Sequence, residues 1–154
     1  MTGSPNSNEE LRQLFARHVP EVAAGIVEIV SVVREAGRLM VAVRSHDSSV
    51  HPVSACVGKH GEHPKSISRE LDGEKISIVL WSESLENFIL NALMPFGPVS
   101  GMPRVTLDAA KHQARVEVTP ETLTYFSGEH GLRVCLASRL VGWDVRLVAK
   151  EEVS

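Results

Sequence analysis

Two short stretches of this sequence each place a pair of glycines around two polar residues. The first reads GKHG at positions 58–61, and the second reads GEHG at positions 128–131. Glycine has no Cβ atom, so a large ligand can approach its backbone closely. A helix is expected to begin directly after each stretch, and the unbonded N–H groups and the dipole of a helix N-terminus favour an anion. We therefore predict that each glycine loop holds the phosphates of a nucleic-acid strand.

The two glycine loops belong to a longer internal repeat. GKHGEHPKSISREL and GEHGLRVCLASRLV share Gly-x-His-Gly, then six residues, then Ser-Arg. Hydrophobic periodicity and turn residues predict the order strand, strand, helix, glycine loop, helix, strand around each copy. The doubled unit predicts an α+β protein of two similar domains. A glycine loop between two helices is also the element with which KH domains clamp about four nucleotides of single-stranded RNA.

The expected elements follow from the spacing of apolar residues and from capping residues. In the first half we expect a short helix containing Leu11, Leu14 and Phe15, then strands at 26–33 and 39–43, helices at 52–57 and 62–71, a strand at 76–80 and a helix at 85–93. In the second half we expect strands at 105–107 and 114–118, helices at 120–128 and 132–140, and a strand at 143–148. The segment FGPVSGMP between the halves predicts a linker. We therefore expect a frayed end at residues 1–8, a first domain at 9–96 and a second domain at 97–154.

Composition restricts the class of protein. The 154 residues are 43% hydrophobic and 23% charged, values that are typical of a folded globular protein. The formal net charge is −3, so any nucleic-acid binding must depend on a local cationic patch and not on overall charge. Two cysteines fit a reducing compartment, and no stretch resembles a signal peptide or a membrane span. We expect a cytoplasmic protein without a membrane partner.

The sequence offers little support for a metal site or an enzyme. The candidate metal ligands His46, His51, Cys56, His60 and His63 match no zinc spacing, and Cys56 is expected to be a small buried packing residue. No nucleophile elbow, P-loop or paired-carboxylate arrangement is recognisable. We therefore expect no metal, no cofactor and no catalysis.

Five longer stretches resemble the tandem KH region of the bacterial NusA family. They are VPEVAAGIVEI at 19–29, SACVGKHG at 54–61, ELDGEKISIVLWSES at 70–84, NFILNALMP at 87–95 and LASRLVGWDV at 136–145. The similarity covers about residues 14 to 150. The resemblance implies two KH domains of type II, each with helices against a three-stranded sheet. It also implies binding of nascent RNA and effects on pausing, termination and antitermination, with RNA polymerase or other transcription factors as partners.

The sequence also departs from the family pattern. NusA proteins ordinarily carry a polymerase-binding domain and an OB-fold domain before the KH region, and this chain has no room for them. It is expected to be a stand-alone protein, a divergent paralogue or a fragment. Glu129 stands where the family usually has a basic residue, and a carboxylate beside a phosphate is repulsive by about 1 kcal/mol at a wet surface. Arg133 is expected to offset it, and the first domain, which keeps Lys59, is expected to dominate RNA affinity.

The expected RNA contacts lie in and after the two glycine loops. They are Gly58, Lys59, His60, Gly61, Lys65 and Arg69 in the first copy, and Gly128, Glu129, His130, Gly131, Arg133 and Arg139 in the second. Bases are expected to pack near Val57 and Ile67, whereas Trp81 and Trp143 are expected to be packing residues. A different class of function stays open, namely a protein-interaction module with degenerate RNA binding, which the net acidity and Glu129 would favour.

Overall fold

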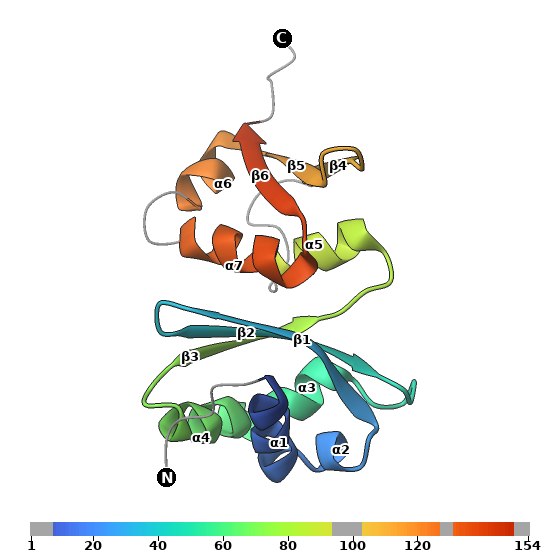
Figure 1. Ribbon diagram of the computed structural model, residues 1–154, viewed down its shortest axis with the longest axis vertical. Helices are drawn as coiled ribbons and strands as arrows, with labels where there is room; N and C mark the ends of the chain where they lie inside the picture. The colour runs from blue at the N-terminus through green and yellow to red at the C-terminus, as the bar shows by residue number, and fades with distance from the viewer. Residues whose placement is uncertain (1–7, 94–102, 127–130, 150–154) are drawn as a thin grey trace. The chain divides into compact units, whose positions relative to one another are not determined.

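The chain folds into two compact units. The computed structural model describes residues 8–93, 103–126 and 131–149 (Figure 1). The units are Met1–Trp81 and Ser82–Ser154. None of the helices in the described residues is both long enough and apolar enough to cross a membrane.

The first unit contains four α-helices, one 3₁₀ turn and three strands among its described residues. In chain order they are α1 (Asn8–His18), α2 (Pro20–Ala23), β1 (Val27–Glu35), β2 (Arg38–Ser45), α3 (Pro52–Val57), the 3₁₀ turn η1 (Lys59–Gly61), α4 (Glu62–Glu70) and β3 (Lys75–Leu80). Helix α1 begins inside the segment that was expected to be frayed, and residues 1–7 lie outside the described residues.

The three strands form one sheet in the order β1-β2-β3. Strands β1 and β2 are an antiparallel hairpin, whose two turn residues Ala36 and Gly37 have φ angles of 51° and 76°. Positive φ at both central residues matches the strand twist, as in a type I′ turn. Strand β3 pairs parallel to β2, and parallel strands need a crossover connection. Helices α3 and α4 with the glycine loop between them provide it, which places the loop between two helices.

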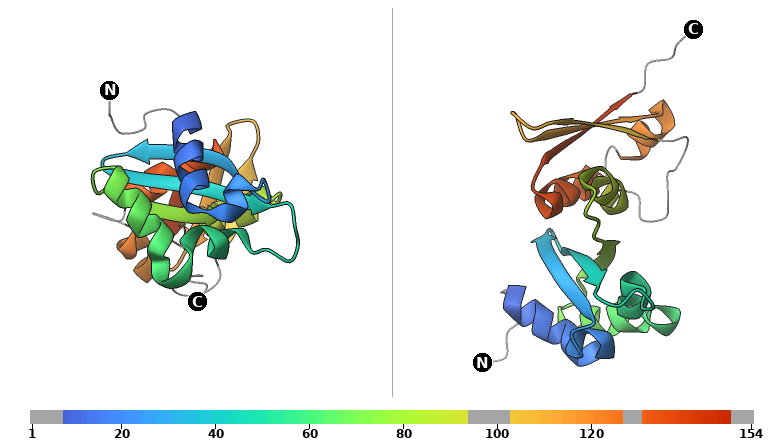
Figure 2. Two further views of the ribbon diagram at one scale, coloured as in Figure 1. Left: turned by 90° about the horizontal axis from the view of Figure 1, so that it is seen from below. Right: turned by 90° about the vertical axis from the view of Figure 1, so that its right-hand side faces the viewer.

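The core of the first unit lies between the sheet and the helices, which cover one face of it (Figures 1 and 2). Leu11, Leu14 and Phe15 of α1 are at most 1% exposed, which confirms the expected apolar face of this helix. Val41 of β2 and Cys56 of α3 belong to the same buried cluster. Complete burial of Cys56 confirms that it is a packing residue.

The second unit repeats this arrangement. Its elements are α5 (Leu85–Leu93), β4 (Arg104–Asp108), β5 (Gln113–Val118), α6 (Pro120–Tyr125), α7 (Gly131–Val141) and β6 (Asp144–Ala149). Strands β4 and β5 are antiparallel, and β6 pairs parallel to β5. The sheet order β4-β5-β6 therefore has the same connectivity as the first sheet. This topology confirms the predicted repeat and the α+β class.

Helix α5 belongs to the second unit, whereas the sequence placed it in the first domain. The structure divides the chain between Trp81 and Ser82, before this helix, and not between residues 96 and 97. The physical reason is the apolar face of α5, where Phe88, Ile89 and Leu93 are buried, and which packs against α7. Ser84 starts the helix as expected, since its Oγ accepts a hydrogen bond from the Asn87 N–H at 3.3 Å. The predicted linker lies largely outside the described residues.

Candidate nucleic-acid interface

The first glycine loop has an unusual backbone. Gly58 has φ 72° and ψ −174°, a region that only glycine occupies without large strain. His60 and Gly61 follow with φ angles of 58° and 70°, both left-handed. The chain thus turns sharply between the end of α3 and the start of α4, and the sequence Gly-x-His-Gly provides residue types that tolerate positive φ.

The two glycines of this loop have different roles. A Cβ atom on Gly58 would lie 2.4 Å from Cδ2 of His63, so the space beside Gly58 is filled by an imidazole ring. A Cβ atom on Gly61 would meet only Cε of Lys65, at 4.0 Å. The space beside the backbone is therefore open at Gly61 and filled by a side chain at Gly58, and contact of either glycine with a ligand stays a prediction. Gly58 is required by the fold of the loop itself.

The helix that follows the loop offers fewer free N–H donors than the sequence implied. The Gly61 N–H donates to the Gly58 carbonyl at 3.4 Å, and the Glu62 N–H donates to the Lys59 carbonyl. Pro64 has no N–H to give. Lys65 compensates in part, because its Nζ donates to the His60 carbonyl at 3.2 Å and so lies over the loop. The positive charge at this site therefore comes mainly from side chains.

An open groove of about 570 Å³ lies beside α4 and the start of β3. Its lining consists of Pro64, Lys65, Ser68, Arg69, Lys75 and Ile76. Lys65 and Arg69 were predicted from the sequence, whereas Lys75 was missed. Lys75 is remote from the glycine loop in sequence, but the crossover brings β3 back along α4. Three cationic side chains thus line one groove next to Gly61, an arrangement suited to a polyanion.

The apolar part of the groove differs from the prediction. Ile67 is completely buried in the core of the first unit, so its own side chain offers no surface to the bases that were expected to pack near it. Residues at α4 positions 64, 65, 68 and 69 line the groove, and Ile67 lies on the opposite face of the helix. Ile76 of β3 is the apolar residue that the groove offers instead. Val57, at the end of α3, is half-buried and packs against the same core.

The second glycine loop is only partly described. Gly128, Glu129 and His130 lie outside the described residues, so the predictions made for them stay predictions. Gly131 is the first residue of α7, and Arg139 is exposed on the same helix.

Arg133 has a structural role that the sequence did not predict. Its Nε donates to the carbonyl of Ala92 at 2.9 Å and to that of Leu93 at 3.1 Å. These carbonyls lie in the last turn of α5, where no intrahelical partner is available. The guanidinium therefore joins α5 to α7. Because Glu129 lies outside the described residues, the expected compensation of Glu129 by Arg133 stays a prediction.

The candidate metal ligands are dispersed over separate contacts. His46 bonds to Glu28 at 2.8 Å, and the His51 Nδ1 accepts from the Ser54 N–H at 3.3 Å, which caps α3. Burial raises the pKa of the Cys56 thiol to about 12, so a thiolate ligand is disfavoured there. Within the parts of the chain that the structure describes, no three His, Cys, Asp or Glu side chains lie together as a metal site would need.

Comparison with known proteins agrees with this geometry. The family described as "NusA-like first KH domain" matches residues 5–81. Proteins named "Transcription termination/antitermination protein NusA" from Rickettsia conorii and Rickettsia prowazekii are each 40% identical over 148 residues, which cover 96% of this chain and 29% of theirs. The protein of that name from Thermus thermophilus is 41% identical over 142 residues, or 92% of this chain and 36% of its own. This chain thus spans about a third of the length of these relatives.

A solved structure shares the fold. The chain named "Crystal structure of APE1850" superposes with a TM-score of 0.63 at 22% identity, covering 94% of this chain and 100% of that chain. At this identity the likeness concerns the fold alone. With the family match, it identifies the two units as tandem KH folds.

Proposed function

Since the chain belongs to the family of NusA-like KH domains, we propose that it binds single-stranded RNA in the groove beside α4 and β3. The observation that carries this proposal is the cationic lining of the groove next to Gly61. Phosphates lie over the open backbone of Gly61, where Lys59 and Lys65 supply positive charge. Arg69 and Lys75 hold the strand farther along. Bases face Ile76, and unpaired RNA is preferred because an A-form duplex hides its base edges.

The cellular role proposed is that of a factor in transcription termination or antitermination, acting in the cytoplasm without enzymatic turnover. The names of the 40% identical relatives support this role. RNA polymerase or another transcription factor is the proposed protein partner. Because the relatives are about three times longer, contact with the polymerase is tested separately from RNA binding.

A substitution pair at Gly61 tests the RNA site. Gly61 is left-handed and faces open space, so Gly61→Asp and Gly61→Asn both fit its backbone, since these residue types tolerate that region. They differ by one negative charge where a phosphate is proposed. In fluorescence anisotropy with a short unstructured RNA, Asp is expected to weaken binding at least tenfold more than Asn. Equal affinities for the two variants would contradict a phosphate at Gly61.

Salt dependence and a charge reversal complete the test. The four cations of the site limit the slope of log affinity against log salt to about −3. Lys59→Glu is expected to weaken binding more than Glu129→Lys strengthens it, if the first unit dominates. No measurable RNA affinity in the unmodified protein would instead favour the protein-interaction module.

A further inference from the structure

Two basic side chains lie next to each other at one end of the first sheet. Arg38 of β2 and Lys75 of β3 are paired directly in the parallel register, so both side chains leave the same face of the sheet, on strands about 4.8 Å apart. The Lys75 N–H donates to the Gly37 carbonyl at 2.9 Å, which fixes the two strand ends relative to each other. Like charges at paired positions of a sheet are destabilising. An anion bound between the members of this cation pair, Arg38 and Lys75, would therefore stabilise it.

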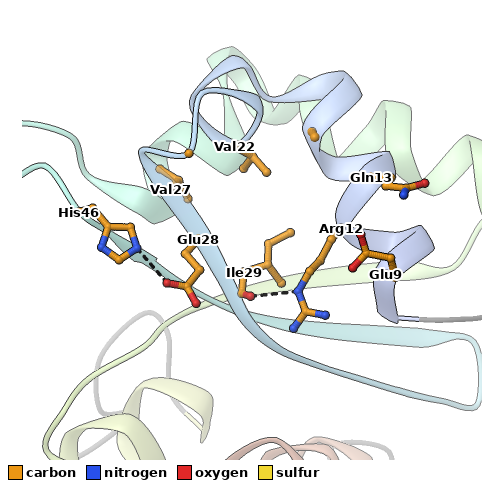
Figure 3. A pocket seen from close by; sticks show the side chains of 10 residues that line it. Glu9, Arg12, Gln13, Val22, Val27, Glu28, Ile29 and His46 are labelled. Carbon is orange, nitrogen blue, oxygen red and sulfur yellow. Dashed lines mark hydrogen bonds and ion pairs between the residues drawn. The ribbon is translucent and has the colours of Figure 1, made fainter.

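Other basic side chains around β1 and β2 already have partners. Arg12 Nε donates to the Ile29 carbonyl at 3.2 Å, and His46 Nε2 is hydrogen-bonded to Glu28 Oε1 at 2.8 Å, as Figure 3 shows. Arg44 Nε donates to the same Glu28 oxygen at 3.0 Å. The side chains of the cation pair, by contrast, have no hydrogen bond or ion pair within the parts of the chain that the structure describes. The first sheet therefore offers available positive charge at the start of β3.

The acidic side chains nearby do not cancel the charge of the cation pair. Glu74 is held by Arg34, whose Nε donates to both carboxylate oxygens at 3.1 Å. Glu35 is opposite Arg38 in the β1–β2 hairpin, but the two form no ion pair in the described part of the chain. At this end of the sheet and along the groove face of α4, the basic residues are Arg34, Arg38, Lys65, Arg69 and Lys75, and the acidic residues are Glu35, Asp72 and Glu74. The region therefore keeps a net positive charge.

We infer that the cation pair binds one phosphate of the RNA strand that occupies the groove. The planar fork of an arginine binds two phosphate oxygens, and a lysine adds a point charge. Lys75 also lines the groove, so the pair continues the groove around the start of β3 toward the β1–β2 turn. The turn leaves room for a ligand, because a Cβ atom on Gly37 would meet nothing within 4 Å. This inference rests on the proposed RNA function and extends it, because it adds Arg38 as an RNA contact outside the glycine loop and the groove.

Neutralising Arg38 is expected to affect RNA affinity but not to lower stability. In fluorescence anisotropy with an unstructured 12-nucleotide RNA at fixed low salt, Arg38→Gln is expected to weaken binding about tenfold, the value of one charged hydrogen bond. The thermal midpoint of the free protein is expected to stay the same or to rise, because a like-charge contact is removed. Arg115→Gln, which removes the same charge from an exposed position of β5 in the second unit, is the matched control and is expected to change affinity less than about twofold. Equal affinities of the two variants would overturn the inference.

A double substitution tests whether the two side chains share one phosphate. Once Arg38→Gln has removed one of two groups that hold the same phosphate, Lys75→Gln has less left to remove. The loss of affinity in the double variant is therefore expected to be smaller than the product of the two single losses. Losses that simply multiply would show that the two side chains contact separate phosphates, and would overturn the shared site.

The same RNA distinguishes failure of this inference from failure of the proposed groove. If Arg38→Gln binds like the unmodified protein while Gly61→Asp binds more weakly than Gly61→Asn, the cation pair is refuted and the groove stands. If Arg38→Gln weakens binding while the two Gly61 variants bind equally, the phosphate at Gly61 is refuted and the cation pair stands. An acidic peptide of equal charge that binds as tightly as the RNA, with the same loss in Arg38→Gln, would assign the pair to a protein partner and refute the phosphate site.

Discussion

Replacing each glycine of the first loop by alanine is expected to have very different effects on stability. At Gly58 an alanine must adopt φ 72° and ψ −174°, which costs about 1–3 kcal/mol. Its Cβ would also lie 2.4 Å from the ring of His63, which must leave its rotamer at a cost of about 0.5–1.5 kcal/mol. The sum is about 1.5–4.5 kcal/mol. At Gly61 the left-handed backbone costs about 1–2 kcal/mol, and the space is open.

This difference can be measured by urea and thermal unfolding. Trp81 fluorescence in a Trp143→Phe background reports on the first unit, because Trp81 ends its sheet. For a domain of this size, 1 kcal/mol shifts the midpoint temperature by about 4–8 °C. Gly58→Ala is therefore expected to lower the midpoint temperature by roughly 6 °C or more, and Gly61→Ala by less. RNA affinity is expected to follow the opposite order among folded molecules, since Gly61 is the open position.

A double substitution isolates the contribution of the His63 ring. Adding His63→Ala to Gly58→Ala removes the overlap but leaves the backbone strain. The two changes are expected to be non-additive by about 1 kcal/mol, with the double variant more stable than the sum predicts. The reasoning is refuted if Gly58→Ala and Gly61→Ala destabilise the protein equally, or if removing the ring gives no recovery.

Three further changes test separate contacts. Arg133→Leu removes the donor to two carbonyls of α5, so urea titration is expected to show a fall of about 1–3 kcal/mol in the free energy of unfolding. RNA affinity is expected to stay unchanged. A loss of RNA affinity without a loss of stability would instead indicate that Arg133 contacts RNA. Glu28 has a pKa held below its ordinary value of 4.5 by hydrogen bonds from His46 and Arg44. Glu28→Gln is expected to lower stability at pH 7 by at most about 1 kcal/mol, and the difference should vanish below pH 4.5 as the native carboxylate is protonated; a pH-independent difference would contradict this. Lys75→Gln is expected to weaken RNA binding and to reduce the salt slope by about 0.7, whereas Lys111→Gln in an exposed turn of the second unit should change neither.

Local features of the sequence were sufficient to predict the helices and strands and their order along the chain. Alternation of apolar residues predicted both hairpins, and Ser84 and Thr119 predicted helix starts whose capping bonds the structure contains. The internal repeat predicted that two similar units follow one another. These predictions hold because strand alternation, helix periodicity and capping depend on neighbours within a few residues.

Contacts between residues distant in sequence decided the rest. The sequence alone could not assign α5 to the second unit, because the assignment depends on the packing of its apolar face against α7. It also could not show that Arg133 donates a hydrogen bond to a carbonyl of α5, or that Lys75 lines the groove beside α4.

The first glycine loop shows most clearly which properties the sequence determines and which the tertiary structure determines. Its two glycines look equivalent in the sequence, since both allow positive φ. Only the folded chain places the His63 ring against Gly58 and leaves Gly61 open. The residue type thus determined which backbone conformations the loop can adopt. The packing of helix α4 decided which of the two glycines a ligand can reach, because access depends on side chains that fold back from the following turn.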